Sequence, residues 1–156
     1  MAINYSPKIG EILECDFGVF KEDEAGTKDY KNYDGRIPPE MVKNRLVMVL
    51  NGKINNACVV VPISSSLDQD KVTRKWHVFI DPKLITTTSF WKPVDRWAKA
   101  DHVIQVSRSR LSKACNSSGG NFLPSETITL IQEAVIRVIG GSSLLRASLP
   151  KKEEVA

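Results

Sequence analysis

Apolar and polar residues alternate in the first strongly patterned stretch of the chain, residues 12–17. Leu13, Cys15 and Phe17 share one side of an extended backbone, because successive side chains of a strand point to opposite faces. The polar residues between them fall on the other side, and Gly18 follows as a breaker. The pattern therefore predicts a first strand that ends at Gly18.

Two near-continuous apolar runs follow at 44–50 and 56–64, separated by a segment that contains Asn51-Gly52. Runs of branched apolar residues are typical of strands buried on both faces, and an Asn-Gly pair is a strong turn signal. The pattern predicts a hairpin of two central strands that turns at Asn51-Gly52. Pro62 lies inside the second run, and since proline cannot donate to a strand ladder we expect a bulge or strand end there.

Shorter strand patterns occur at 75–80 and 96–106. Near the C-terminal end, apolar residues recur at helical spacing and predict one amphipathic helix. These residues are Ile128, Ile131, Val135 and Val138, with Ala134 beside them. Ser125 is expected to cap the helix at its start, and Gly140-Gly141 to end it.

The segment 20–39 lacks any hydrophobic period, and connecting segments of that length are usually functional or disordered. No repeat or linker divides the chain, so we expect one domain over residues 1–148, with 20–39 as a long loop and 149–156 as a flexible tail. Strands come first and the main helix last. This order predicts a mainly β protein of the α+β class, a compact antiparallel sheet or small barrel.

Composition excludes several other classes of protein. The 156 residues are 42% hydrophobic and 26% charged, as in ordinary globular proteins, so wholesale disorder is not expected. The apolar runs are too short to cross a bilayer and no signal sequence opens the chain, so we expect a cytoplasmic protein with no membrane association. The three cysteines have neither disulfide-frame nor metal-ligand spacing, and we expect free thiols and no metal site.

Charge is distributed unevenly along the chain. The net charge is +4, yet residues 71–113 alone hold ten lysines and arginines against three aspartates. A basic region of this kind fits a phosphate-bearing partner, and an ordinary solvated surface fits the charge count equally well.

A cation and an anion stand two residues apart in the strand predicted at 96–106. Trp97, Lys99 and Asp101 would share one face of that strand, while Ala98 and Ala100 would face the core with His102. One interpretation is a surface ion pair, worth roughly 0–1 kcal/mol. The other is an acid and a base beside an aromatic ring on which a nucleobase can stack. His102 is open to a structural or an acid–base role, whereas we expect a structural role for His77.

Arg45 opens the second predicted strand and Ser64 closes the third. A hairpin places its two free ends together, so Arg45 and Ser64 should lie at the same end of the sheet. A guanidinium and a hydroxyl so placed can hold a phosphate, although each alone is an ordinary residue for a strand end.

Four short motifs, in this order along the chain, resemble the PemK/MazF family, the toxin half of bacterial toxin–antitoxin pairs. The motifs are residues 10–17, 40–50, 60–64 and 97–103, and a helix follows them at the appropriate spacing. The resemblance implies a small SH3-like or CcdB-type antiparallel β-barrel with a C-terminal helix. It also implies a homodimer with a cognate antitoxin protein as partner. The activity it implies is cleavage of single-stranded RNA, such as mRNA, without a metal or other cofactor.

The resemblance also assigns residues. The family arginine falls on Arg45, the threonine or serine that ends the next strand falls on Ser64, and a basic residue two before an aspartate falls on Lys99 and Asp101. Three features depart from the family pattern. Leu46 replaces the usual proline, position 99 is lysine rather than arginine, and the first loop is longer than usual.

These residue types are consistent with metal-free RNA cleavage by the substrate's own 2′-hydroxyl. We hypothesise that Asp101 is the base or orienter of that hydroxyl, Lys99 the acid or charge partner, and Arg45 the phosphate grip, with Ser64 bonding a non-bridging oxygen. Further candidates for RNA contact are Lys43, Trp97, His102 and Tyr33, together with Trp91 as a stacking group. Two alternatives stay open: a toxin that acts by protein contact, and an inactive or nucleic-acid-binding relative.

Overall fold

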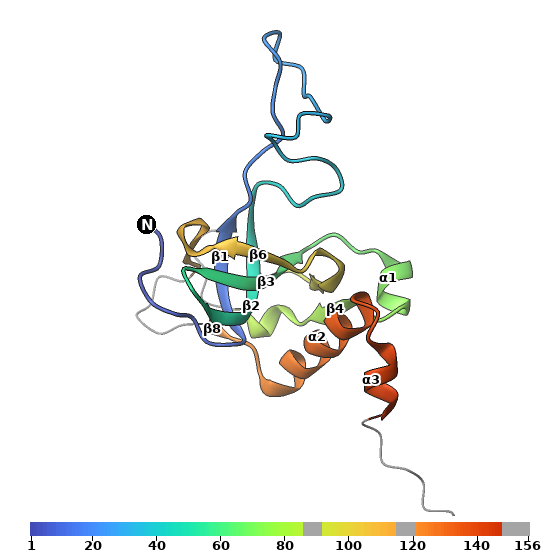
Figure 1. The fold of residues 1–156 in the computed structure, drawn as a ribbon. Coiled ribbons are helices and arrows are strands. Elements are labelled where there is room, and N and C mark those ends of the chain that lie inside the picture. The colour runs from blue at the N-terminus through green and yellow to red at the C-terminus, as the bar shows by residue number, and fades with distance from the viewer. Residues whose placement is uncertain (86–91, 115–120, 148–156) are drawn as a thin grey trace, which may run out of the picture.

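Eight antiparallel strands form the body of the protein in a computed structural model that describes residues 1–85, 92–114 and 121–147 (Figure 1). The strands are β1 (Glu11–Asp16), β2 (Asn44–Ile54), β3 (Ala57–Ser64), β4 (His77–Ile80), β5 (Arg96–Lys99), β6 (Ile104–Ser107), β7 (Leu111–Lys113) and β8 (Asn121–Phe122). The helices are α1 (Gln69–Thr73), α2 (Ser125–Val138) and α3 (Ser142–Ala147). Three single 3₁₀ turns complete the elements: η1 (Pro82–Leu84), η2 (Ala100–His102) and η3 (Arg108–Arg110).

The strand order is β4-β5-β3-β2-β1-β7, with β6 added on β3 and β8 on β1. The segment 104–113 thus joins the two sides of the sheet, because β6 at its start pairs with β3 and β7 at its end pairs with β1. The prediction of a mostly antiparallel sheet with a C-terminal helix is confirmed. Among the described residues, however, the hydrogen-bonded ladder does not close into the ring of a full barrel.

The hairpin between β2 and β3 turns later than predicted, at Asn55 and Asn56. Asn56 takes the left-handed conformation that the turn needs, with φ of 54°. The Asn51-Gly52 pair instead lies inside β2, where the register with β3 shifts. Gly52 is needed there for space, since a Cβ at this position would lie 2.0 Å from the carbonyl oxygen of Pro7. The turn predicted at Asn51-Gly52 is therefore wrong.

The strand predicted over 96–106 is broken in its middle by η2. β5 pairs with the end of β3 and β6 pairs with its beginning, so the chain must step sideways between the two partners. Pro62 lies inside β3, opposite Val47 of β2, in the stretch that neither of these ladders includes. The expected bulge or strand end at Pro62 is not found. The break at η2 means that the alternation of faces holds for Trp97 and Lys99 but does not extend to Asp101.

The predicted helix is α2, and it packs against β4 and η2. Ile131 and Ala134 are fully buried on its inner face, as the helical spacing indicated. Its N-cap is Pro124, and Ser125, the predicted cap, is the first helical residue. Gly140, with φ of +84°, follows the helix end. Since α2 presses on η2, it supports the turn that holds Asp101.

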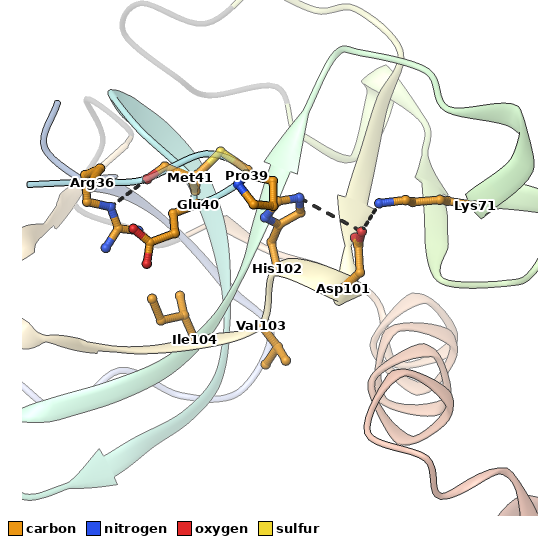
Figure 2. A pocket seen from close by; sticks show the side chains of 9 residues that line it. All are labelled: Arg36, Pro39, Glu40, Met41, Lys71, Asp101, His102, Val103 and Ile104. Atoms are coloured by element: carbon orange, nitrogen blue, oxygen red, sulfur yellow. Dashed lines mark hydrogen bonds and ion pairs between the residues drawn. The ribbon is translucent and has the colours of Figure 1, made fainter. Parts of the chain in front are cut away.

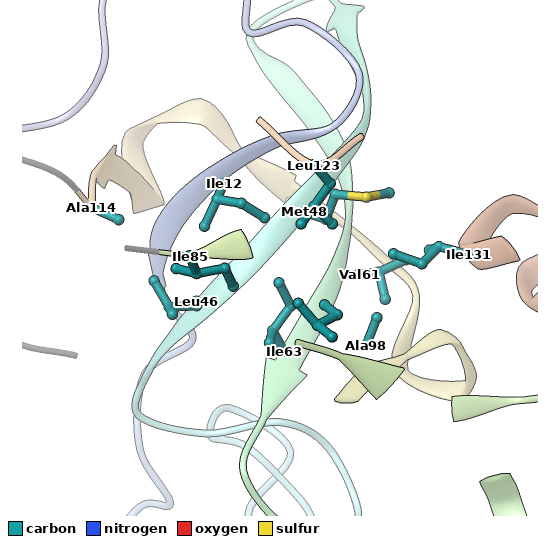
Figure 3. Packing of buried hydrophobic residues seen from close by; sticks show 11 residues of the cluster. Ile12, Leu46, Met48, Val61, Ile63, Ile85, Ala98, Ala114, Leu123 and Ile131 are labelled. Carbon is teal, nitrogen blue, oxygen red and sulfur yellow. The ribbon is translucent and has the colours of Figure 1, made fainter. Parts of the chain in front are cut away.

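Two buried clusters lie on the two faces of the central strands. The first contains Ile12, Leu46, Met48, Val61 and Ile63 and is covered by Ile131 of α2 (Figure 3). The second contains Leu13, Phe17, Val47, Val60 and Leu111, together with the free thiols of Cys15 and Cys58. Burial raises the pKa of the Cys15 thiol to about 12, so this cysteine stays protonated and inert.

The long loop stands out from the sheet as an arm (Figure 1). Apart from one isolated bridge between Glu22 and Lys28, residues 20–39 contain no strand or helix. The predicted tail at 149–156, Cys115 and Trp91 lie outside the described residues. In the part of the chain that is described, no helix is both long enough and apolar enough to span a bilayer.

Candidate functional site

Neighbouring strands place four side chains in one row across the end of the sheet. The β2–β3 ladder ends one position before Arg45 and Ser64, so these residues face each other at the next step of the register. Ser64 pairs with Trp97 of β5, and Trp97 pairs with Phe79 of β4. Directly opposed residues of antiparallel strands share a face. Arg45, Ser64, Trp97 and Phe79 therefore follow one another on one face.

Lys99 lies on the same face, two residues beyond Trp97, and pairs with His77 of β4. Burial lowers the pKa of the Lys99 ammonium, the carboxylate of Asp101 raises it, and the positive charge of Arg45 is among those that lower it again. The pKa of Lys99 thus depends on the charges of both Arg45 and Asp101. The fold brings three of the four predicted catalytic residues to one face, with the fourth next to it.

Asp101 has a polar partner on each carboxylate oxygen. Its Oδ1 lies 2.6 Å from Nε2 of His77. Its Oδ2 lies 2.5 Å from Nζ of Lys71 (Figure 2). Only 11% of the Asp101 side chain is exposed. Burial raises the pKa of this carboxyl, but the hydrogen bonds from Lys71 and His77 outweigh it and hold the pKa below its usual value. Asp101 is therefore an ionised, firmly held carboxylate.

Sequence reasoning missed the part played by Lys71 and His77. Lys71 comes from α1, 30 residues before Asp101, and His77 from β4, 24 residues before it. His77 was expected to be structural and is indeed buried, with 2% of its side chain exposed. An ionised carboxylate only accepts hydrogen bonds, so the Nε2–H of His77 donates to Asp101. Nδ1 of His77 is buried and has no hydrogen-bond partner among the described residues.

A pocket of about 300 Å³ opens beside this cluster, between η2, the start of β6 and the base of the long loop (Figure 2). Its lining residues are Arg36, Pro39, Glu40, Met41, Lys71, Asp101, His102, Val103 and Ile104. The loop side is held by two local hydrogen bonds, from Nε of Arg36 to the Met41 carbonyl at 3.0 Å and from the Ile37 amide to Glu40 at 2.7 Å. His102 faces this pocket, and burial lowers its pKa below the ordinary value for histidine.

A second pocket, of about 580 Å³, adjoins Arg45. It is lined by Val19, Phe20, Lys21, Glu22, Lys28, Val42, Lys43 and Arg45. The Nε of Arg45 donates a hydrogen bond to the carbonyl of Val42, at 3.2 Å. Its two terminal nitrogens donate no hydrogen bond within the described part of the chain. Arg45 and Asp101 thus open into different pockets, on the two sides of the strip 39–43. Ser64 lines neither pocket and is 7% exposed.

The remaining residues predicted to contact RNA lie in different parts of the structure. Lys43 lines the second pocket, and Trp97 contacts the ring of Phe79, with centroids 5.9 Å apart. Tyr33 is 88% exposed on the projecting arm and lines neither pocket. In the described ranges, no group of three histidine, cysteine or acidic side chains has a geometry that could hold a metal ion. The roles assigned to these residues stay predictions.

Comparison with known proteins adds three kinds of similarity. Residues 8–139 match the family model described as PemK-like, MazF-like toxin of type II toxin–antitoxin system. The uncharacterized protein YifN of Escherichia coli (strain K12) is 54% identical over 148 residues, which cover 93% of this chain and 99% of that protein. An uncharacterized protein of Haemophilus influenzae is 42% identical over 143 residues, covering 90% of this chain and 95% of that one.

Among solved structures, this fold is similar to MazF (Form-I) from Deinococcus radiodurans, with a TM-score of 0.55 and 13% identity over 88% of this chain and 99% of that chain. It is also similar to a MazE-MazF structure (Form-II) from the same organism, with a TM-score of 0.50 and 13% identity over 88% of this chain and 98% of that one. At that identity, the likeness concerns the fold.

Proposed function

The chain belongs to the PemK-like, MazF-like family of toxins from type II toxin–antitoxin systems, and from this premise we propose that it is an endoribonuclease that cuts single-stranded RNA without a metal. The observation that carries the proposal is the placement of Arg45, Ser64 and Lys99 on one face, from three different strands. A binding surface alone would not need a guanidinium, a hydroxyl and a half-buried ammonium on one face of the sheet.

The proposed reaction uses the substrate's own 2′-hydroxyl as the nucleophile. Its oxygen attacks the adjacent phosphorus, the bond to the 5′-oxygen breaks, and the products carry a 2′,3′-cyclic phosphate and a 5′-hydroxyl. Arg45 holds the phosphate through its terminal nitrogens, and Ser64 donates to a non-bridging oxygen. Lys99 protonates the departing 5′-oxygen, and burial eases this by lowering the pKa of its ammonium.

Asp101 contributes a fixed negative charge beside this centre. Because both of its oxygens already accept hydrogen bonds, the geometry supports the orienting role that the sequence left open, rather than proton removal. RNA on either side of the cut would meet Lys43 in the second pocket and Trp97 in the row. Tyr33 on the arm is a contact for RNA only if the strand reaches along the loop.

We also propose a cognate antitoxin as protein partner, a homodimer as the working form, and action in the cytoplasm. The fold is similar to that of MazF in the MazE-MazF structure, which supports the first of these. Large apolar side chains on α2, at its C-cap and on α3 supply surface for protein contact, since Leu130, Ile139 and Leu144 are each more than half exposed.

The proposal is tested by incubating the protein with a long single-stranded RNA in excess EDTA and mapping the ends of the fragments. We expect cuts at a few defined positions, each leaving a 5′-hydroxyl. Ser64→Ala protein purified in the same way is the control for contaminating nucleases, and it should cut about 10²-fold more slowly because one donor to the phosphate is lost. RNA that stays intact would favour a toxin acting by protein contact, or an inactive relative.

A further inference from the structure

Both oxygens of the Asp101 carboxylate are occupied before any substrate arrives. His77 donates to Oδ1 and Lys71 to Oδ2, at 2.6 Å and 2.5 Å, and the side chain is largely buried. Protonating this carboxylate would break or weaken an ion pair and a hydrogen bond at once. A general base works best when its pKa lies near the operating pH. Asp101 is therefore poorly suited to accept a proton at neutral pH.

His102, the next residue, has a more exposed side chain than Asp101 and makes no direct hydrogen bond to it. Its Nε2 lies 4.0 Å from Oδ2 of Asp101, too far for a direct hydrogen bond. A substrate hydroxyl about 2.8 Å from each atom would fit between them. The imidazole is 21% exposed and lines the same pocket as Asp101, so it can be reached by a ligand (Figure 2).

Charged groups from several elements act on His102. Burial lowers its pKa, the carboxylate of Asp101 raises it, and Lys99 from β5, Lys71 from α1 and His77 from β4 lower it further. Arg36 and Glu40 of the loop line the same pocket with opposite charges. The imidazole of His102 is consequently neutral at neutral pH, as a proton acceptor must be.

We propose that His102 accepts the proton of the 2′-hydroxyl, and that Lys71 and His77 are positioning residues that hold Asp101 as a fixed anion beside it. This assignment rests on the proposed function. The proton passes from the 2′-oxygen to an imidazole nitrogen of His102 as the 2′-oxygen bonds to phosphorus. The phosphorus–5′-oxygen bond breaks, and the 5′-oxygen takes a proton from the Lys99 ammonium. Asp101 stabilises the imidazolium that forms and is not itself protonated.

The experiment is a pH profile of single-turnover cleavage for the full chain and its variants. In the parent, the rate should rise with pH through the pKa of His102, which lies below its ordinary value. His102→Ala should cut roughly 10²–10⁴-fold more slowly, lose this acid limb, and recover part of the rate in buffers containing imidazole. His102 is partly exposed, so this variant is expected to fold.

Two further variants should move the acid limb in opposite directions. Asp101→Asn removes the charge that raises the pKa of His102, so its limb should shift to lower pH. Lys71→Met removes a charge that lowers this pKa, so its limb should shift to higher pH. His77→Gln keeps a donor for Asp101 and should retain most of the activity, whereas His77→Leu should lose it. A merely structural role for Asp101 or Lys71 would leave the acid limb of the pH profile where it is in the parent.

The outcomes distinguish a failure of the His102 assignment from a failure of the proposed nuclease function. An acid limb that persists in His102→Ala but vanishes in Asp101→Asn would make Asp101 the base and overturn the assignment, with the nuclease function intact. Limbs that coincide in Asp101→Asn and Lys71→Met would remove these residues from the positioning role. A parent chain that leaves RNA intact at every pH would overturn both the function and the assignment.

Discussion

Replacing Arg45 with alanine is expected to slow single-turnover RNA cleavage by roughly 10²–10³-fold, the loss seen when one preorganised donor to a developing anion is removed. Arg45 is placed opposite Ser64 at the end of the β2–β3 ladder, and its Nε is already anchored to the Val42 carbonyl. The terminal nitrogens are therefore presented in a fixed position. A fixed donor is worth more than a mobile one because it needs no reorganisation during the reaction.

Two variants sharpen this measurement. Arg45→Lys keeps the positive charge but loses the planar fork, so it should recover only part of the rate. Arg137→Ala removes one positive charge from α2, where Arg137 lies 3.8 Å from Glu133, and should leave cleavage unchanged. If Arg45→Ala cut RNA within a few-fold of the parent, Arg45 would have no place in the reaction.

Replacing Asp101 with alanine should also destabilise the protein, by about 1–3 kcal/mol, because it leaves the buried donor of His77 unsatisfied and Lys71 without its partner. For a chain of this size each kcal/mol corresponds to roughly 2–4 °C in Tm. Asp70→Ala is the matched control. Its carboxylate pairs with Arg74 at 3.0 Å but is 71% exposed, and the loss of an exposed pair should change the free energy of unfolding by less than about 0.5 kcal/mol.

The stability difference between Asp101→Ala and the parent should depend on pH. The pKa of Asp101 is lower in the folded chain than in the unfolded chain. Its stabilisation is therefore complete above the unfolded pKa, about 3.9, and is lost as the pH falls through the folded pKa. Thermal melts at pH 7 and at pH values below about 3.9 should show the difference shrinking in acid. Equal melting of Asp101→Ala and Asp70→Ala at pH 7 would show that the buried contacts contribute nothing.

The elements that sequence predicts best are those set by long apolar runs. β2 and β3 lie where branched residues cluster, and α2 lies where Ile131 and Ala134 repeat at helical spacing. The sequence pattern predicts the hairpin turn too early because Asn51-Gly52 is a stronger local turn signal than Asn55-Asn56. A tertiary contact overrides this local turn signal. Pro7 packs so close to position 52 that only glycine fits there, and β2 continues past it.

The site shows a similar division between local and long-range information. The hairpin brings Arg45 and Ser64 to the same end of the sheet, as the sequence predicts. Strand alternation correctly places Trp97 and Lys99 on one face. Alternation failed at Asp101 because the step from one β3 ladder to the other inserts η2, and no breaker residue marks that step. The contacts of Asp101 with Lys71 and His77 depend on how α1 and β4 pack, which no spacing in the sequence reveals.

The most direct test of RNA cleavage by the substrate's own hydroxyl uses two oligonucleotides that span one mapped cleavage position. They are identical except that the second carries a 2′-deoxy nucleotide on the 5′ side of the cut. In EDTA, the all-ribose strand should be cut to a 5′-hydroxyl end, while the substituted strand should stay whole and still compete for binding. Cutting of the substituted strand at the same bond would contradict the reaction assigned to Arg45, Ser64 and Lys99.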